Sequence, residues 1–369
     1  MTKVVYDHEV FSSQKFGGVS RYFCEIATRI GQRNHWRTQV VAPLHFNRHL
    51  ASSNLSTIGI YIPNPHPRLD PIYHWASNIV APMAMAMSSP DLIHQTYFAD
   101  RQRRSNVPVV ITVYDMIHEL YPQYFSDNDT TRQRKRESVF AADRIICISH
   151  NTAKDLTECL GVPSAKITVT HLGFSAVFGR QRESQNSLMQ SSNRPYLLYV
   201  GQRGGYKNFG RFLEAYASSA PLVRNMDVIA FGGNPLTKKE LIRNADFRLR
   251  PDAIRHVAGD DEALAAYYSG ARAFVYPSEY EGFGIPPLEA MSCGCPVICG
   301  GGSSIPEVVG TAGEYFDASN VESIRTAIEH VALSDIRCSE LISAGYAQCQ
   351  RFSWDKCADE TLNAYRLVL

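Results

Sequence analysis

Two glutamates eight residues apart, Glu281 and Glu289, have the residue type and spacing to bind a polyol. Glu281 follows an apolar run that ends at Tyr276, and Glu289 lies in the segment "IPPLEAM", whose prolines predict the first turn of a helix. A carboxylate can accept charge-assisted hydrogen bonds from two vicinal hydroxyls, which suits a sugar or a ribose. Capping or solubilising roles are the alternative, but a carboxylate within an apolar helix suits them poorly.

Two cations, Arg203 and Lys207, lie in the glycine-rich segment "YVGQRGGYKNFGRF" between a predicted strand and a predicted helix. Cations and free backbone N–H groups at the start of a helix are what a diphosphate requires. The segment lacks the GK[ST] sequence of a Walker loop. It therefore predicts either a different kind of diphosphate site or a pair of solvated surface charges.

A glycine pair, Gly17 and Gly18, precedes another predicted helix in "QKFGGVSRYF". Glycines there let the backbone approach an anionic ligand closely, although a simple tight turn would also use them. The spacing is not GxGxxG, which disfavours a nicotinamide-dependent oxidoreductase.

The elements that would position these residues alternate in two successive series. Short apolar runs typical of buried parallel strands occur in both halves, and amphipathic segments separate them. The runs are "KVVYD", "TQVVAP", "DLIHQ", "VPVVITVYD" and "RIICIS" in the first half, and "YLLYVG", "MDVIAFGG", "RHVAG", "ARAFVYPS" and "CPVICGG" in the second. We predict an α/β protein with two doubly wound domains, residues 1–178 and 194–352, joined by a polar linker over 179–193. The apolar spacing of residues 355–369 predicts a terminal amphipathic helix.

Composition limits the partners and the compartment. The net charge of +1 and the 20% of charged residues give no general attraction to nucleic acid. Nine irregularly spaced cysteines predict a reducing, cytoplasmic location rather than disulfides or a zinc site. The segment "NIVAPMAMAM" is too short to span a bilayer, so membrane contact would be peripheral. Basic clusters at 101–104 and 132–136 either hold an anionic lipid-linked acceptor at a membrane surface or are solvated helix faces.

Several of these segments together carry a family resemblance. "EGFGIPPLE" resembles the E-x7-E motif of retaining glycosyltransferases of family 4, which have the GT-B fold. "YVGQRGGYKNFGRFLEA" resembles their phosphate-binding loop, and "FGGVSRYF" resembles their N-terminal glycine loop. The resemblance implies two Rossmann-like domains facing across a cleft, an acceptor domain first and a nucleotide-sugar domain second, with the C-terminal helix crossing back to the first.

The resemblance also implies roles for individual residues. Glu289 would bind the ribose hydroxyls, Glu281 would face the donor sugar, and Arg203 and Lys207 would neutralise the leaving diphosphate. It further places at the donor Gly17, Gly18, Val257 and the backbone N–H groups of Phe283, Gly284 and Ile285.

One position departs from the family pattern. Members often carry a histidine near the anomeric carbon, in a "T-x-H" sequence, where this chain has Tyr114. Asp115 follows directly as a candidate catalytic residue. His118 and His94 are further candidates for the vicinity of the acceptor or sugar.

The expected activity is hexosyl transfer, of glucose or mannose type, with retention at the anomeric carbon. The donor would be UDP- or GDP-linked, and the acceptor a hydroxyl of a glycan or lipid-linked oligosaccharide in polysaccharide or lipopolysaccharide synthesis. We expect no metal and no cofactor, since two cations already face the diphosphate, and a cytoplasmic enzyme that is peripheral at the inner face of the membrane. A GT-B nucleotide-sugar epimerase and a non-catalytic sugar-nucleotide-binding subunit remain the alternatives.

Overall fold

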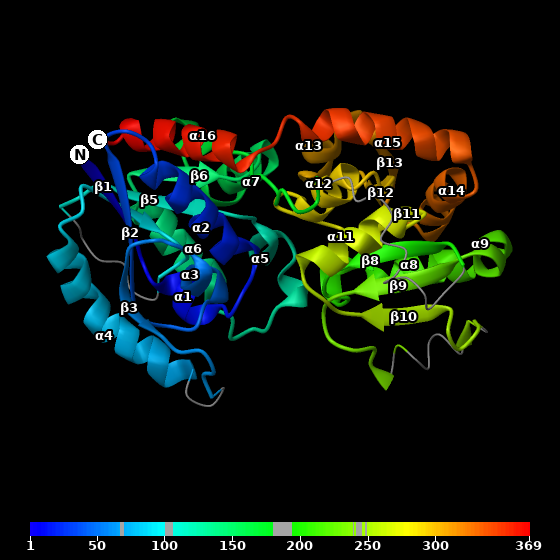
Figure 1. Cartoon of the computed structure of the whole chain (residues 1–369), viewed down its shortest axis with the longest axis horizontal. Coiled ribbons are helices and arrows are strands. Elements are labelled where there is room, and N and C mark those ends of the chain that lie inside the picture. The colour runs from blue at the N-terminus through cyan, green and yellow to red at the C-terminus, as the bar shows by residue number, and fades with distance from the viewer. Residues whose placement is uncertain (67–69, 100–105, 180–193, 239, 241–245, 248) are drawn as a thin grey trace. The chain divides into compact units, whose positions relative to one another are not determined.

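The structure, a computed structural model, describes residues 1–66, 70–99, 106–179, 194–238, 240, 246–247 and 249–369. These residues form two compact units, Met1–Gly173 with Ser353–Leu369, and Phe174–Phe352 (Figure 1). Except for Gly179, the predicted linker 179–193 lies outside the described residues. The predicted end of the first domain, residue 178, differs from the observed boundary. Phe178 belongs to the second unit because its ring packs on Tyr268, at 6.0 Å between centroids.

The first unit is built on a seven-stranded sheet in the order β3-β2-β1-β4-β5-β6-β7. Every pair of neighbouring strands is parallel. The strand order reverses between β1 and β4, which makes their carboxyl ends the expected place for a ligand. The strands are β1 (Thr2–Tyr6), β2 (Trp36–His45), β3 (Thr57–Tyr61), β4 (Leu92–Gln95), β5 (Val109–Val113), β6 (Arg144–Cys147) and β7 (Ile167–Val169).

Helices of the first unit cover both sides of its sheet, with α4 and α16 at opposite sides (Figure 1). The C-terminal helix α16 packs against α2. It begins where the Ser353 hydroxyl accepts a hydrogen bond from the Lys356 N–H, and it buries Trp354 and Tyr365. The helices are α1 (Glu9–Ser13), α2 (Gly18–Gly31), α3 (Arg48–Ser52), α4 (Asp70–Ser88), α5 (Ile117–Leu120), α6 (Thr131–Ala141), α7 (His150–Leu160) and α16 (Trp354–Arg366), with 3-10 turns η2 (Pro122–Tyr124) and η3 (Ser164–Lys166).

The second unit repeats this architecture with a six-stranded parallel sheet in the order β10-β9-β8-β11-β12-β13. The strands are β8 (Tyr196–Val200), β9 (Asp227–Phe231), β10 (Ile254–Val257), β11 (Ala273–Tyr276), β12 (Val297–Gly300) and β13 (Gly313–Phe316). The helices are α8 (Phe209–Ala217), α9 (Ala220–Asn225), α11 (Asp261–Gly270), α12 (Ile285–Ser292), α13 (Ile305–Val309), α14 (Val321–Ala332) and α15 (Asp335–Cys349), with 3-10 turns η4 (Gly205–Lys207) and η5 (Gly310–Ala312).

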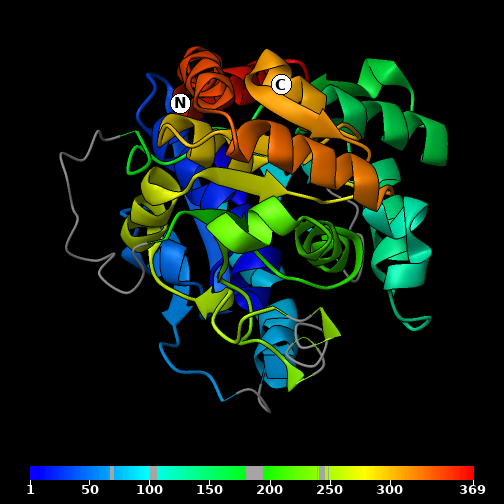
Figure 2. The same ribbon diagram turned by 90° about the vertical axis from the view of Figure 1, so that its right-hand side faces the viewer.

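A continuous apolar core joins the sheet of the second unit to its helices. Phe212 of α8 and Ile328 of α14 are fully buried in it, and α14 packs beside α8 (Figures 1 and 2). The predicted fold class, two α/β domains with doubly wound parallel sheets, is confirmed. Among the described residues, no helix has both the length and the apolar character that crossing a bilayer requires.

Candidate active-site residues

Lys207 and Glu281, 74 residues apart in the chain, meet at the carboxyl ends of β8 and β11. The Lys207 Nζ atom lies 2.6 Å from Glu281 Oε1. The same ammonium faces the aromatic rings of Tyr206 and Tyr276, at 5.0 and 6.0 Å from their centroids. The two side chains are 23% and 13% exposed, so a ligand can reach both. The pair thus offers a cation for an anion and a carboxylate for hydroxyls at one place.

Two hydrogen bonds bring the two loops together. The side-chain amide of Asn208, directly after Lys207, donates from Nδ2 to the carbonyl of Pro277 at 3.0 Å, and the backbone N–H of Glu279 donates to the carbonyl of Tyr206 at 2.8 Å. Asn208 has φ +57°, in the left-handed region that asparagine tolerates better than most residues. These contacts hold the loop after β8 against the loop after β11, which explains why Lys207 and Glu281 lie close together.

Two serines hold the turn that carries Glu281. The Ser304 hydroxyl lies 2.7 Å from both the Glu281 and the Phe283 carbonyl oxygens, and the N–H of Glu281 donates to the Ser303 hydroxyl at 3.0 Å. Gly284, at φ +133°, occupies a conformation that side chains rarely adopt and precedes Ile285, the first residue of α12. Residues 283–285 thus lead into a helix N-terminus, whose first N–H groups have no partner within the helix itself. Neither serine was predicted from the sequence, although the small residues of "GGGSSIPE" were a usable signal.

Glu289 lies within α12 and is 7% exposed. The Tyr268 hydroxyl donates to Glu289 Oε2 at 3.4 Å. Burial first, and the Glu289 charge second, raise the pKa of Tyr268 well above its usual value, so this phenol remains a donor. The carboxylate is therefore held in one orientation inside an otherwise apolar helix, which agrees with a binding role better than with a solubilising one.

Arg203, the other cation of the loop, has different partners. Its Nε atom lies 2.7 Å from Glu240 Oε1, and its Nη2 atom donates to the Pro235 carbonyl at 3.0 Å. The guanidinium also faces the ring of Phe209, and the side chain is only 6% exposed. Arg203 therefore has other partners than the Lys207–Glu281 pair. The predicted contact of Arg203 with a diphosphate stays a prediction.

The remaining predicted donor residues lie at the ends of elements in both units. Val257 ends β10, and Asp260 then caps α11 by accepting from the Ala263 N–H at 2.9 Å. Gly18 begins α2, and a Cβ atom added there would meet no described atom within 4 Å. Open space at Gly18 agrees with a ligand approaching its backbone, whereas a Cβ at Gly17 would lie 2.7 Å from Gln14 Oε1.

A small pocket in the first unit gathers three predicted residues, Tyr114, Asp115 and His118. Its volume is about 80 Å³. It lies between the loop after β5 and the region around the start of α2, at the carboxyl edge of the sheet where a ligand is expected. The lining residues are Gln14, Val19, Tyr97, Phe98, Tyr114, Asp115 and His118.

The side chains of this pocket are oriented by neighbours. The Tyr114 hydroxyl donates to the Thr96 carbonyl at 3.2 Å, and burial raises the pKa of Tyr114 well above its usual value. The His118 ring stacks on Phe125 with 3.9 Å between centroids, and its Nε2 atom lies 3.6 Å from Asp129 Oδ2. Burial, followed by the Lys135 charge, lowers the pKa of His118. The imidazole is therefore biased toward its neutral form, which can accept a proton or a hydrogen bond.

His94 lies apart from the pocket, which corrects the expectation that it faces an acceptor or sugar. It is fully buried, with Nδ1 2.6 Å from the Tyr365 hydroxyl and Nε2 2.9 Å from Thr112 Oγ1. Burial lowers the pKa of His94 to about 3. Both ring nitrogens are therefore engaged, Nδ1 with the C-terminal helix and Nε2 with the neighbouring strand β5.

Of the two predicted basic clusters, the structure describes only one. The cluster 101–104 lies outside the described residues. In the cluster 132–136, Lys135 is 1% exposed and is paired with Glu119, and Arg134 donates to the Phe98 carbonyl. The inward turn of these two residues leaves Arg132 and Arg136 as the exposed cations of that cluster.

The helix α4 of the first unit carries an exposed apolar face. Six large apolar side chains of this helix are at least 43% exposed, namely Ile72, Trp75, Ile79, Val80, Met83 and Met87. The segment 71–87 contains no Asp, Glu, Lys or Arg. Trp75, Ile79, Pro82 and Met85 of the same helix also line a pocket of about 960 Å³. Exposed apolar side chains gathered on one helix are a feature of surfaces that bind a partner or a membrane.

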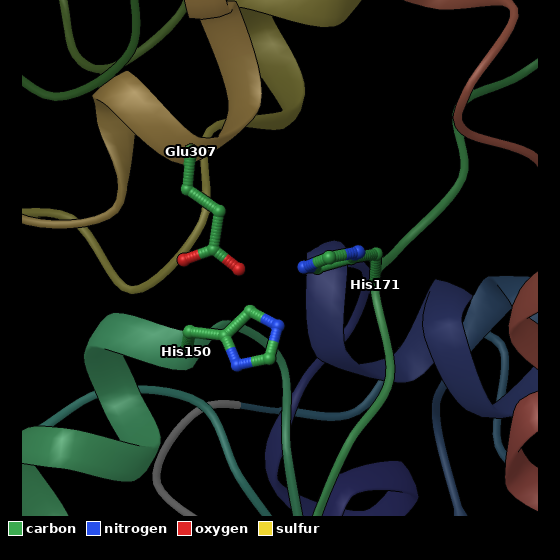
Figure 3. Close-up of side chains that lie close together, drawn as sticks. All are labelled: His150, His171 and Glu307. Carbon is green, nitrogen blue, oxygen red and sulfur yellow. The ribbon is translucent and has the colours of Figure 1, made fainter.

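His150 and His171, both of the first unit, form a close imidazole pair. Their ring centroids are 5.7 Å apart with the rings nearly perpendicular (Figure 3). Glu307, which is labelled in the same figure, belongs to α13 of the second unit. Within the first unit, the pair supplies two imidazoles, fewer than the three or four protein ligands that zinc sites use.

Comparison with known sequences agrees with this architecture. The family model described as Glycosyltransferase Family 4 matches residues 16–176, and the one described as Glycosyl transferases group 1 matches residues 180–348. An Escherichia coli protein, "O-antigen chain mannosyltransferase B", is 33% identical over 70% of this chain and 70% of its own length. The E. coli "Serotype-specific mannosyltransferase WbdA" is 27% identical over 80% of this chain but only 39% of that longer protein.

Solved structures show the same fold. A sucrose-phosphate synthase from Thermosynechococcus elongatus superposes with a TM-score of 0.80 at 20% identity, covering 100% of this chain and 99% of that one. Anabaena HepE in complex with UDP-glucose superposes with a TM-score of 0.76 at 16% identity, covering both chains completely. With both halves matched by glycosyltransferase models, and a relative one-third identical over most of each chain, the chain belongs to glycosyltransferase family 4 and is a glycosyltransferase.

Proposed function

We propose that the protein is a retaining mannosyltransferase of O-antigen-type polysaccharide synthesis. It moves mannose from a nucleotide diphosphate sugar to a hydroxyl of a glycan or a lipid-linked oligosaccharide. The names of the E. coli relatives support the sugar and the pathway. The observation that carries the proposal is the accessible Lys207–Glu281 pair beside the start of α12, because it combines a cation for a leaving diphosphate with a carboxylate for sugar hydroxyls.

On the donor side, each residue has a task that its surroundings support. Lys207 exchanges its contact with Glu281 for the diphosphate, whose negative charge grows as the glycosidic bond breaks. Glu281 then accepts hydrogen bonds from the sugar hydroxyls, and the N–H groups of residues 283–285 add donors at a helix N-terminus. Glu289, oriented by Tyr268, accepts from the ribose hydroxyls.

We propose that the acceptor attacks on the face from which the diphosphate departs. The bond from the anomeric carbon to the phosphate oxygen breaks, the bond to the acceptor oxygen forms, and the departing phosphate takes the acceptor's proton. This sequence gives retention without a protein nucleophile. It needs no metal, because Lys207 and the helix N-termini supply the positive potential at the phosphate.

On the acceptor side, Asp115 and His118 are the proposed contacts. They line one pocket at the carboxyl edge of the sheet, and the pKa of His118 is lowered, so its imidazole accepts a hydrogen bond from a hydroxyl at neutral pH. Tyr114 supplies a buried wall rather than a charge.

We also propose a cytoplasmic enzyme that touches the membrane surface through α4. All nine cysteines are free thiols, which agrees with a reducing compartment. The uncharged, exposed apolar face of α4, with Trp75 among its side chains, suits the boundary between headgroups and acyl chains.

Thermal unfolding with a panel of nucleotides and nucleotide sugars tests the proposal. A ligand that binds the native state raises the midpoint by mass action. We expect GDP-mannose and GDP to raise the midpoint most, and UDP-glucose to do so less. An unchanged midpoint with every nucleotide sugar at millimolar concentration would contradict the donor site proposed here.

A further inference from the structure

Lys135 is a buried cation for which the proposed chemistry gives no role. It lies on α6, and its side chain is 1% exposed. Its Nζ atom donates to the Asp115 carbonyl at 3.0 Å and lies 2.6 Å from Oε2 of Glu119, whose side chain is 6% exposed. The ammonium also lies 5.6 Å from the centroid of the Phe98 ring. Burial of a charge is costly, so a buried lysine side chain requires contacts of this quality.

These contacts connect the two ends of one short turn. Asp115 follows β5, and Glu119 lies in α5, so the ammonium bridges residues 115 and 119. His118 lies between them, and both Asp115 and His118 line the pocket of about 80 Å³. Phe98, on which the ammonium packs, lines it too. Lys135 therefore lies directly behind the pocket without lining it.

We propose that Lys135 is a positioning residue for the acceptor, since its pairing with Glu119 fixes the turn that presents Asp115 and His118 to the pocket. The inference rests on the proposed function only in taking this pocket as the acceptor side. Neither Lys135 nor Glu119 touches the substrate. Both act through the residues of the turn.

The same pair sets the charge around His118. Four charged groups surround this imidazole, namely Lys135 of α6, Glu119 of α5, Asp115 before α5 and Asp129 before α6, and Phe125 stacks on its ring. Lys135 opposes protonation of His118, whereas the three carboxylates favour it. Removing Lys135 and removing the charge of Glu119 should therefore move the pKa of His118 in opposite directions, which loss of packing alone would not do.

The test compares Lys135→Met and Glu119→Gln, with Arg132→Met, an exposed residue of the same helix, as the matched control. NMR titration of the His118 imidazole should give a raised pKa in Lys135→Met, a lowered pKa in Glu119→Gln and no change in the control. The acid limb of the pH–rate profile should shift in the same two directions. At neutral pH both variants should lower kcat or raise the acceptor KM at least tenfold, with the donor KM unchanged within twofold.

A further variant covers the risk that Lys135→Met fails to fold because it leaves Glu119 charged and buried. Lys135→Met combined with Glu119→Gln removes both charges together, and such replacements are commonly tolerated. That variant should fold, bind the donor normally and still show the loss at the acceptor.

Two results would overturn the inference. They are pKa shifts of His118 that are absent or have the same sign in the two single variants, and an unchanged kcat and acceptor KM in folded variants. The titration needs no sugar transfer, and donor binding is read separately by thermal shift. If the proposed function is wrong, the unmodified protein itself will show no donor binding, and this outcome is distinct from failure of the inference about Lys135.

Discussion

The Lys207–Glu281 ion pair sets the electrostatics of the proposed donor site. Without donor, the two charges neutralise each other at 2.6 Å. A bound diphosphate competes for the ammonium and releases the carboxylate toward the sugar. The pair therefore couples recognition of the phosphate to recognition of the sugar, which neither residue alone would do.

Replacing Lys207 with alanine should slow chemistry more than it weakens donor binding. The charge that Lys207 meets is larger in the transition state than in the ground state, so the loss belongs mainly in kcat. Loss of one such electrostatic partner costs about 10²–10³ in rate. Steady-state kinetics with varied donor measure it, with Lys154→Ala, an exposed lysine on α7, as control. A normal kcat with only a raised donor KM would show that Lys207 merely recruits the donor.

Replacing Glu289 with alanine should weaken nucleotide binding and leave the fold intact. Each lost hydrogen bond to the carboxylate costs roughly 1.5–3 kcal/mol, or about 10–150-fold in Kd. Calorimetric titration with GDP measures the effect, and Glu340→Ala, on the exposed side of α15, is the control. If Glu289→Ala binds GDP as tightly as the unmodified protein, Glu289 does not belong to the nucleotide site.

The residues that sequence could identify are those that carry a local motif. Glu281, Glu289 and Lys207 stand in segments whose glycines, prolines and charges are unusual enough to be recognised. Lys135 carries no such motif, because its role depends on Glu119, 16 residues away, through packing of one element on another. Nothing in the sequence indicates that His94 is buried, because a histidine at the end of a strand is equally compatible with binding a ligand and with a buried hydrogen bond.

At the level of elements, the strands that were not predicted from the sequence all lie at the edges of the two sheets. The predicted runs include β1, β2, β4, β5 and β6 of the first sheet, but not β3 or β7, and β13 is absent from those of the second. All three missed strands are edge strands, and β3 and β7 have no fully buried residues. A central strand covered by helices on both faces has a continuous apolar run, whereas a short edge strand does not need one.

The C-terminal helix should make the first unit acid-sensitive through His94. The pKa of this group is about 3 in the folded protein against 6.5 for the ordinary imidazole. The unfolded chain therefore takes up a proton as the pH falls below 6.5, while the folded protein does not until about pH 3, so stability is lost across that range. By pH 5 the loss is about 2 kcal/mol.

Chemical denaturation at pH 7.5 and pH 5 tests this effect. His94→Gln should remove this part of the difference in unfolding free energy, while His330→Gln, at an exposed histidine of α14, should not. Tyr365→Phe keeps the titrating ring but leaves a buried nitrogen without its partner, at a cost of roughly 1–3 kcal/mol at both pH values. An unaltered pH dependence in His94→Gln would show that the acid sensitivity lies elsewhere.

The apolar face of α4 should govern contact with lipid. Ile79→Glu combined with Met83→Glu places two charges on a face that is already exposed, so folding should be unaffected. Co-sedimentation with phosphatidylglycerol–phosphatidylethanolamine vesicles should fall at least tenfold. The control is Ile336→Glu, which charges a still more exposed apolar residue on α15. Equal sedimentation of the two variants would exclude α4 as the lipid contact.

At the scale of the whole molecule, each unit carries one half of the proposed chemistry. The second unit presents Lys207, Glu281 and Glu289 at the carboxyl ends of its strands and in the helix that follows β11. The first presents Asp115 and His118 at the corresponding edge of its own sheet. This duplication follows from the doubly wound topology, which gathers loops at one sheet edge and leaves the other to structural turns.

The measurement that tests the central claim most directly is product analysis with a labelled donor. The protein is incubated with GDP-mannose labelled in the sugar and an O-antigen-type glycan acceptor, in excess chelator, and the new linkage is assigned by NMR. The account predicts labelled mannose joined to an acceptor hydroxyl with the same anomeric configuration as in the donor. An inverted configuration, an absolute need for added metal, or label recovered only as an epimerised donor would contradict it.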